Sequence, residues 1–315
     1  MAACILEEIF TADVIERLKR HPAPSTTLTR RIDILTGTET PDADRDTQNW
    51  NLILCARKAA WNKYLSAMRG AGLLDDDVRA RLTDTDDDNF RSALAECLTC
   101  HFLARVLGLD IFGRHEGRPG TALDFGVRHA GGDVSVEVKS PYAEKPAGSY
   151  WGDHSDILEP VLDVANKQFL EGRRNVLALV PLVDFPVLAG RKPYVKAFFG
   201  EPKIVFTIDK RTGRAIGEPE TRFITEGKFL KLWPEPRFTR TGAVIAIREN
   251  VVEDGFLEED FEPHAELRWF ALHNPHCPNP VPVDLWGSCA QLVRDGDVIR
   301  WTDGGPIDGS PPPRP

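Results

Sequence analysis

The sequence predicts an α/β protein in three parts: a helical N-terminal region, a mixed central sheet flanked by helices, and a strand-rich C-terminal extension. Apolar residues recur at helical spacing within residues 1–87, and the period switches between helical and alternating within residues 88–200. Short strand-like runs separated by turns fill residues 201–303, which we expect to pack on the central part. The Pro-rich end, residues 304–315, has the composition of a disordered tail.

The N-terminal region is expected to be mostly helical. Helices are predicted in three stretches, residues 11–20, 50–68 and 76–82. Residues 21–46 are rich in Pro, Thr and Asp and predict a loop. Acidic runs at 75–77 and 84–88 directly precede helical patterns, where carboxylates satisfy free N–H groups and the helix dipole. These runs therefore predict helix caps rather than metal ligands.

The central region predicts a sheet with helices packed against it. Periodicity indicates the order helix, strand, strand, helix, strand over residues 89–107, 121–127, 134–139, 157–169 and 175–183. The first two strands are expected to form a β-hairpin, because Gly131 and Gly132 provide a turn between them. A further strand of this sheet is expected at 109–114 or at an edge segment.

The composition predicts a soluble, cytoplasmic protein with no membrane partner. Of the 315 residues, 42% are hydrophobic, and no apolar run approaches the ~20 residues that span a bilayer. The six cysteines are scattered and are interpreted as reduced thiols, with Cys97 and Cys100 packed inside a helix. The net charge of −9 argues against a partner bound by charge along the whole surface, but acidic and basic residues balance between 114 and 203.

Three charged residues of the predicted hairpin share one face. Alternation places Asp124 on one side of the first strand, and Glu137 and Lys139 on the same side of the second. Leu123 and the other apolar residues of the first strand are expected on the opposite face. If the strands close symmetrically around 128–133, Asp124 lies directly opposite Glu137, with Cβ atoms ~4.5 to 5.5 Å apart. Two carboxylates so close resist joint ionisation unless a cation lies between them, and a hard divalent ion suits oxygen ligands.

Glu96 lies on an apolar stripe of the helix that precedes this hairpin. Its helical neighbours at steps of three and four are apolar, so its carboxylate needs a partner. Two alternatives remain open from the residues alone. Glu96 contributes to a metal site beside Asp124, or it forms a salt bridge with a nearby arginine such as Arg105 or Arg91.

These residues resemble the signature of a known superfamily. Glu96 on a helix, Asp124 in TALDF, and the Glu137 and Lys139 of SVEVKS are similar to the Glu, Asp, (D/E)xK pattern of the PD-(D/E)XK nucleases. The resemblance covers residues 88–185, and the predicted element order agrees with the α-β-β-β-α-β core of this restriction-endonuclease-like fold. The chain departs from the fullest pattern at Leu123, where that pattern has Pro before the Asp.

The resemblance implies a role for each matched residue. It assigns Mg²⁺, with Mn²⁺ as a substitute, to ligands on Asp124, Glu137, the Val138 carbonyl and Glu96. Lys139 positions or activates the attacking water. The metal lowers the pKa of bound water and neutralises charge in the transition state. The expected reaction is hydrolysis of phosphodiester bonds.

Two further polar residues are candidates for contacting the substrate. Gln168 lies on the core-facing flank of the helix 157–169, whereas Lys167 lies roughly opposite the buried side. Some members of the superfamily place a Gln at the position of Gln168 to contact phosphate or metal-bound water. Ser140 directly follows Lys139. For both Gln168 and Ser140, an ordinary structural role is the alternative.

The expected function is that of a nuclease, with DNA favoured over RNA and an endonuclease favoured over an exonuclease. A homodimer is compatible with the sequence. The alternative is a catalytically silent nuclease-like module that binds nucleic acid or a protein partner. A zinc site is a minor possibility, because the cysteine and histidine residues of the C-terminal part are adjacent or interrupted by prolines: His273, His276, Cys277 and Cys289.

Overall fold

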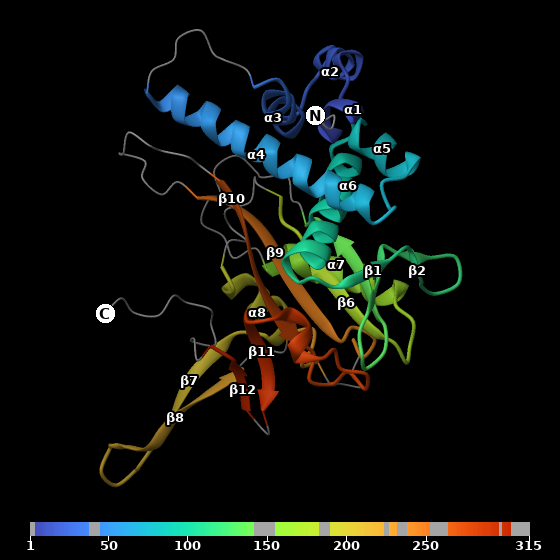
Figure 1. Ribbon diagram of the computed structural model, residues 1–315. Helices are drawn as coiled ribbons and strands as arrows, with labels where there is room; N and C mark the ends of the chain where they lie inside the picture. Colours follow the sequence, from blue (N-terminus) through green and yellow to red (C-terminus); the bar gives the residue numbers. More distant parts are fainter. Residues whose placement is uncertain are drawn as a thin grey trace.

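The protein is a mixed α/β molecule with a large central sheet flanked by helices, as predicted (Figure 1). The computed structural model describes residues 4–37, 45–141, 155–182, 190–223, 227–231, 238–252, 264–295 and 298–303. The predicted tail at 304–315 lies outside the described residues. None of the described helices has the length and apolarity that crossing a bilayer requires.

Six helices form the N-terminal part: α1 (Ile5–Ile9), α2 (Ala12–Lys19), α3 (Thr26–Thr36), α4 (Arg45–Gly70), α5 (Asp76–Leu82) and α6 (Asp87–His101). Helix α3 corrects the prediction of a loop over residues 21–46. The Ser25 side chain caps it by accepting the Leu28 N–H at 3.0 Å, and Gly37 ends it in the left-handed region at φ 57°. Leu28, Ile34 and Leu35 of α3 are buried, which outweighs its high Thr content.

The two acidic runs cap helices, which confirms the prediction made for them. The Asp75 carboxylate accepts the N–H of Val78 at 2.9 Å at the start of α5. The Asp86 carboxylate accepts the N–H groups of Asp88 and Asn89 at the start of α6, at 2.8 and 3.0 Å. Both runs are therefore explained by the helices that follow them.

Eight strands form the central sheet. In spatial order they are β1 (Asp110–Phe112), β4 (Phe125–Arg128), β5 (Val134–Lys139), β6 (Arg174–Leu179), β9 (Ala243–Val252), β10 (His264–His273), β11 (Ala290–Asp295) and β12 (Val298–Trp301). Strands β5, β6 and β9 are parallel, as are β10 and β11, and the other pairs are antiparallel. Strands from 88–200 and from 201–303 thus belong to one sheet, and the predicted strand at 109–114 is its edge strand β1.

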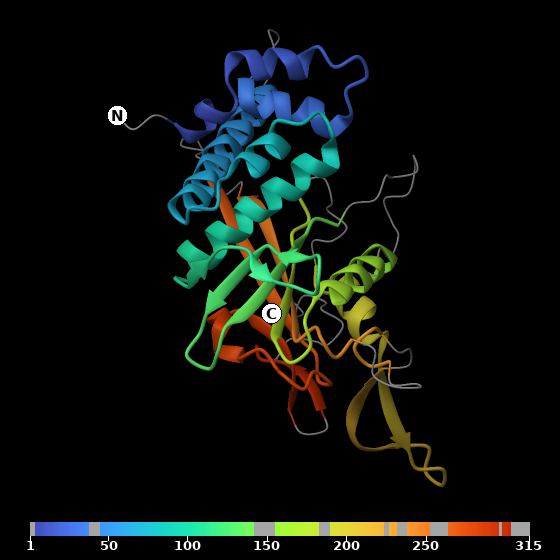
Figure 2. The ribbon, with the colours of Figure 1, turned by 90° about the vertical axis from the view of Figure 1, so that its right-hand side faces the viewer.

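Helices cover both faces of this sheet (Figure 2). On one face, Val134, Val136 and Val138 of β5 pack with α6 and the N-terminal helices in one apolar core. On the other, Leu177 and Leu179 of β6 pack with α7 (Ser155–Gln168) and α8 (Lys192–Phe199) in a second core. The site residues of β5 alternate with these valines and therefore face the second core.

Two predicted elements are interrupted, and one of the interruptions falls at Asp124. The strand expected over 121–127 is divided at Asp124 into β3 (Ala122–Leu123), which pairs with β2 (His115–Glu116), and β4. Because the chain bends there, Leu123 packs in the second core while the next apolar residues of the strand pack in the first, which corrects the single apolar face predicted for them. The helix expected over 89–107 is α-helical to His101 and then a π-helix, η1 (Phe102–Val106).

Among the described residues, strands β7 (Pro202–Ile208) and β8 (Ala215–Phe223) pair only with each other and form a separate two-stranded ribbon. The ribbon projects away from the body of the molecule, at the end opposite the N-terminal helices, in both ribbon views (Figures 1 and 2). All six cysteines are free, and Cys97 and Cys100 are buried in α6, as their interpretation as packing residues predicts.

Candidate active site

The β4–β5 hairpin brings Asp124 close to Glu137. Phe125 pairs with Val136 and Val127 with Val134 across β4 and β5. This is the register predicted from the symmetric turn, but the described ladder ends at Phe125, one residue before Asp124, and the Glu137 charge acts on Asp124 across the bend. Asp124 itself lies in the bend between β3 and β4, at the end of the ladder.

The Asp124 carboxylate is fixed by the backbone of β5. Its Oδ2 accepts the N–H of Val138 at 2.7 Å, which ties the bend to the neighbouring strand. Burial raises the pKa of Asp124 well above its usual value, and the negative charges of Glu137 and Glu96 raise it further. The Val138 N–H and the Lys139 ammonium act in the opposite direction. Asp124 is thus held in a place where an additional positive charge would be favourable.

Glu137 is almost fully buried, with 2% of its surface exposed. Its Oε1 accepts a hydrogen bond from Lys139 Nζ at 2.5 Å, while its buried Oε2 has no hydrogen-bond partner. Burial raises the pKa of Glu137, against the lowering effect of Lys139 and of the nearby Gln168 amide. A buried carboxylate oxygen without a donor is unfavourable and calls for a ligand.

Glu96 is bound to an arginine that the sequence did not indicate. Arg81 Nη1 and Nη2 reach Glu96 Oε1 and Oε2 at 2.6 and 2.9 Å, a bidentate ion pair between α5 and α6. Of the two partners expected for a salt bridge, Arg91 instead pairs with Asp88, and no described contact joins Arg105 to Glu96. The negative charge of Glu96 still acts on the site, because it contributes to the raised pKa of Asp124.

Gln168 lies beside the Glu137 carboxylate, and Ser140 directly follows Lys139 at the end of β5. Gln168 ends α7 and lies close enough to Glu137 to lower its pKa. Its Oε1 is buried and has no hydrogen-bond partner, and the same holds for the Ser140 hydroxyl directly after β5. Lys167 is exposed, as predicted. The structure therefore brings Gln168 beside Glu137, whereas no described contact joins Ser140 to the carboxylates.

The oxygens of this cluster suit a hard divalent cation. Glu137 Oε2 is buried and lacks a partner, and Asp124 has one oxygen beyond the one that accepts the Val138 N–H. The N–H and C=O of one strand residue point to the same side, so the Val138 carbonyl also faces Asp124. In the part of the chain that the structure describes, no three His, Cys, Asp or Glu side chains are grouped closely enough to hold a metal. The donor set is thus two carboxylates and a carbonyl, with Glu96 occupied by Arg81.

Three residues near the site were not foreseen. Arg81 could not be linked to Glu96, because they lie on different helices whose packing is tertiary. His115 Nδ1 lies 2.7 Å from Ser135 Oγ, and Ser135 is on the same face of β5 as Glu137. Burial and the positive charge of Arg173 lower the pKa of His115. No sequence spacing marks this pair, since β2 is only two residues long.

The structure does not support the zinc site that the C-terminal His and Cys residues left as a minor alternative. His273 Nε2 lies 2.9 Å from Gln291 Oε1, and Cys277 Sγ lies 3.4 Å from the Asn279 carbonyl. Both side chains are thus engaged with protein groups, in agreement with the lack of any metal-binding group among the described residues.

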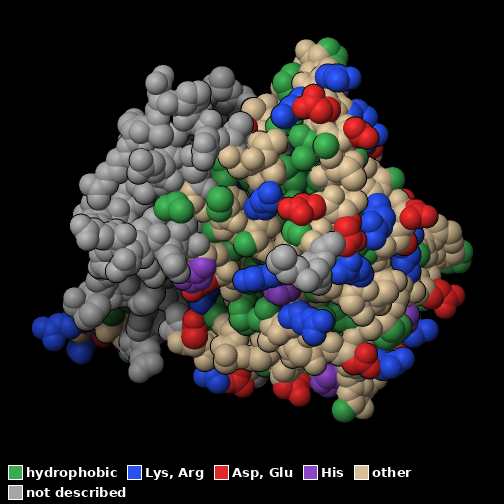
Figure 3. Space-filling view, turned by 45° about the horizontal axis from the view of Figure 1, so that its top comes forward, with side chains coloured by type: hydrophobic (Ala, Val, Ile, Leu, Met, Phe, Trp, Pro, Cys, Tyr) green, Lys and Arg blue, Asp and Glu red, His purple; other side chains and the backbone are tan. Residues whose placement is uncertain are grey.

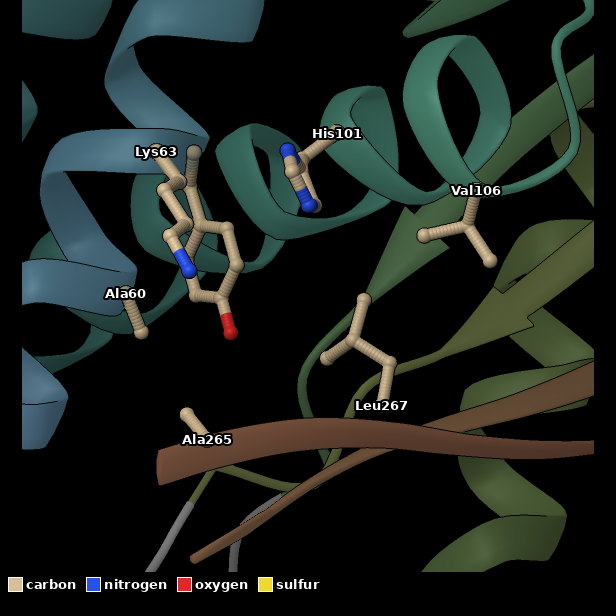
Figure 4. Close-up of a pocket in the computed structure, with 7 residues that line it drawn as sticks. Ala60, Lys63, His101, Val106, Ala265 and Leu267 are labelled. Carbon is tan, nitrogen blue, oxygen red and sulfur yellow. The ribbon is translucent and has the colours of Figure 1, made fainter. Parts of the chain in front are cut away.

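A separate pocket of about 170 Å³ lies between α4, the end of α6 with η1, and β10 (Figure 4). It is lined by Ala60, Lys63, Tyr64, His101, Val106, Ala265 and Leu267. Behind it, the Tyr64 hydroxyl donates to the buried Glu249 carboxylate at 2.7 Å. None of the candidate site residues lines this pocket, so it plays no part in the chemistry considered for Asp124 and Glu137.

Replacing Tyr64 by phenylalanine should destabilise the protein by about 1 to 3 kcal/mol, because the buried Glu249 loses its hydroxyl donor. The matched control is Tyr194→Phe, whose buried hydroxyl has no hydrogen-bond partner and whose loss should leave stability nearly unchanged. Urea denaturation followed by circular dichroism measures both. Equal free energies of unfolding for the two variants would show that the Tyr64 hydrogen bond contributes nothing.

Comparison with known proteins adds no relative: no family model, no curated protein and no solved structure matches this chain. The described part of the surface in Figure 3 mixes Lys and Arg with Asp and Glu over the visible face. No single-sign patch on that face therefore indicates a ligand. The buried cluster around Asp124 and Glu137 is the feature from which a function can be inferred.

Proposed function

We propose that this protein is a metal-dependent nuclease of the PD-(D/E)XK type, which hydrolyses phosphodiester bonds and acts on DNA rather than RNA. The observation that carries the proposal is the proximity of the buried Asp124 and Glu137 carboxyls, with Asp124 Oδ2 accepting the Val138 N–H at 2.7 Å and Lys139 Nζ 2.5 Å from Glu137 Oε1. The chain order α6, β1, β4, β5, α7, β6 supports a restriction-endonuclease-like core, in which three strands separate the two helices.

Asp124, Glu137 and the Val138 carbonyl are the groups that would hold Mg²⁺ or Mn²⁺. When bound there, the cation would lower the pKa of water and neutralise charge on the phosphate. The protein contributes oxygen donors that are fixed before binding: one by the Val138 N–H and the other by Lys139. Glu96 would join them only by exchanging Arg81 for the metal or for a water.

Lys139 supplies a positive charge at the reacting end of β5. From its position on Glu137 Oε1, the ammonium can orient the attacking water and stabilise hydroxide. Gln168 has an unpartnered polar atom and lies near Glu137, which suits it to hold a phosphate oxygen. The buried Ser140 hydroxyl, directly after Lys139 in the chain, is a second candidate. These residues would position the scissile phosphate without themselves forming a covalent bond.

The test is cleavage of a panel of nucleic acids by the purified full-length protein. We expect Mg²⁺ or Mn²⁺ to produce cleavage of double-stranded DNA, including a closed circular plasmid, and EDTA to abolish it. The plasmid distinguishes an endonuclease, which opens the circle, from an exonuclease, which does not. If no metal produces cleavage of DNA or RNA, whether single- or double-stranded, the alternative of a silent binding module replaces this proposal.

Metal binding has an independent readout in thermal stability. Because the folded-state pKa of Asp124 and of Glu137 is raised, these carboxyls favour folding most at low pH and lose that contribution as the pH rises through the folded pKa. A cation binds only the ionised carboxylates. The rise in melting temperature on adding Mg²⁺ should therefore grow as the pH is raised, and a rise that shrinks with pH would exclude these residues as ligands.

A further inference from the structure

The β7–β8 ribbon is anchored at its base and projects from the rest of the molecule. Its base is anchored in the second core, where the Phe223 ring lies 5.9 Å from that of Phe199. Beyond this point the two strands pair only with each other, and the ribbon leaves the body of the molecule (Figures 1 and 2). An isolated two-stranded ribbon is marginally stable in water, so its projection needs an explanation beyond packing.

The tip of the ribbon is basic although the chain as a whole is acidic. Lys210, Arg211 and Arg214 are exposed in the turn between the strands, and none of them forms an ion pair with a described residue. The only acidic residue of the turn is Asp209, whose carboxylate accepts the N–H groups of Arg211 and Thr212 at 2.7 and 3.4 Å. Asp209 therefore shapes the turn, and three cations remain available on a chain of net charge −9.

Apolar side chains are exposed just behind this tip. Ile208 is 59% exposed and Ile216 is 54% exposed. In the register of the ribbon, Ile208 pairs with Ala215 and Ile216 with Thr207, so the two isoleucines point to opposite faces. The two isoleucines therefore do not share one apolar patch at the described end of the ribbon. The tip is instead distinguished by its positive charge.

We propose that the β7–β8 ribbon binds duplex DNA by entering the major groove, with its basic tip on the phosphates. A two-stranded β-ribbon fits a B-form major groove, which is ~12 Å wide, whereas the deep and narrow major groove of A-form RNA excludes it. Lys and Arg neutralise phosphates and hold the duplex, while the one isoleucine on the face turned toward the bases meets base edges or methyl groups. The inference rests on the proposed function in taking nucleic acid as the substrate, and it adds a second binding region outside the site.

The experiment is fluorescence anisotropy of a labelled DNA duplex with the full-length protein in EDTA, where no cleavage interferes. The triple variant Lys210→Gln, Arg211→Gln, Arg214→Gln should bind about tenfold or more weakly at ~0.1 M salt. The steepness of log K against log salt should fall by about 0.9 for each phosphate that the variant no longer neutralises. Duplex RNA should bind more weakly than DNA to the unaltered protein and should be less affected by the variant.

The matched control removes three exposed positive charges from the end of α2, on the opposite side of the molecule: Arg17→Gln, Lys19→Gln, Arg20→Gln. It should retain the affinity and the salt dependence of the unaltered protein. Equal losses of DNA affinity in both triple variants would show that only the net charge of the protein matters, and this would overturn the proposal. An unchanged DNA affinity of the tip variant overturns it too, and a shift in oligomeric state would then assign the ribbon to self-association.

Failure of this inference can be told apart from failure of the proposed function. If the ribbon binds DNA but no metal produces cleavage, the ribbon proposal stands and the nuclease proposal fails. If the protein cleaves DNA and the tip variant binds DNA as tightly as the unaltered protein, the nuclease proposal stands and the ribbon proposal fails. Circular dichroism of the tip variant should match that of the unaltered protein, since the three side chains are exposed.

Discussion

Replacing Lys139 by methionine is expected to lower the rate of metal-dependent DNA cleavage by about 10²- to 10⁴-fold, the range for loss of a positioned acid–base group. Methionine keeps the length of the aliphatic side chain but removes the ammonium that contacts Glu137 Oε1. Single-turnover cleavage with saturating protein measures the chemical step apart from substrate binding.

The control for this prediction is Lys167→Met, which removes an exposed ammonium from the solvent side of α7. It should cleave at the rate of the unaltered protein. A Lys139→Met variant that cleaves within about threefold of that rate would remove Lys139 from the catalytic residues, whatever the role of Asp124 and Glu137.

Replacing Arg81 by methionine is expected to destabilise the fold by about 3 to 5 kcal/mol, because it leaves the Glu96 carboxylate buried without its charged partner. The Glu96 side chain is only 9% exposed, whereas that of Arg81 is 21% exposed, so the lower end of this range is favoured. Urea denaturation of the metal-free protein measures the loss.

The double variant Arg81→Met, Glu96→Met separates charge from packing. With both partners replaced by apolar side chains, most of the stability should return, since no buried charge remains. A destabilisation below about 1 kcal/mol for Arg81→Met alone would mean that water screens the pair like a surface ion pair.

Sequence reasoning succeeds at this site where the determinant is local. The pairing of Phe125 with Val136 and of Val127 with Val134 depends only on strand alternation and a symmetric turn, both readable within a few residues. The bend at Asp124 was missed, because it depends on a hydrogen bond to the Val138 N–H of the next strand. The buried face of α7 was predicted correctly for the same local reason: its apolar residues repeat at helical spacing.

The features that were not predicted from the sequence depend on tertiary packing. Nothing within α6 indicates that Glu96 meets Arg81, because the ion pair depends on how α5 crosses α6. Helix α3 was assigned to a loop because its Thr content hid an apolar stripe that becomes buried only in the assembled N-terminal part. The strand at the start of the C-terminal part was expected, but its place in a separate ribbon depends on pairing with β8.

The continuous sheet determines where the chain can be truncated without breaking strand pairing. Strand β6 carries the end of the superfamily-like part, yet its free side is completed by β9, whose residues Ala243 to Ala246 pair with Val176 to Leu179. A fragment ending at residue 200 would leave β6 as an open apolar edge, which is a template for intermolecular strand pairing. The C-terminal part is therefore an integral half of the folding unit, and the smallest autonomous piece contains both halves.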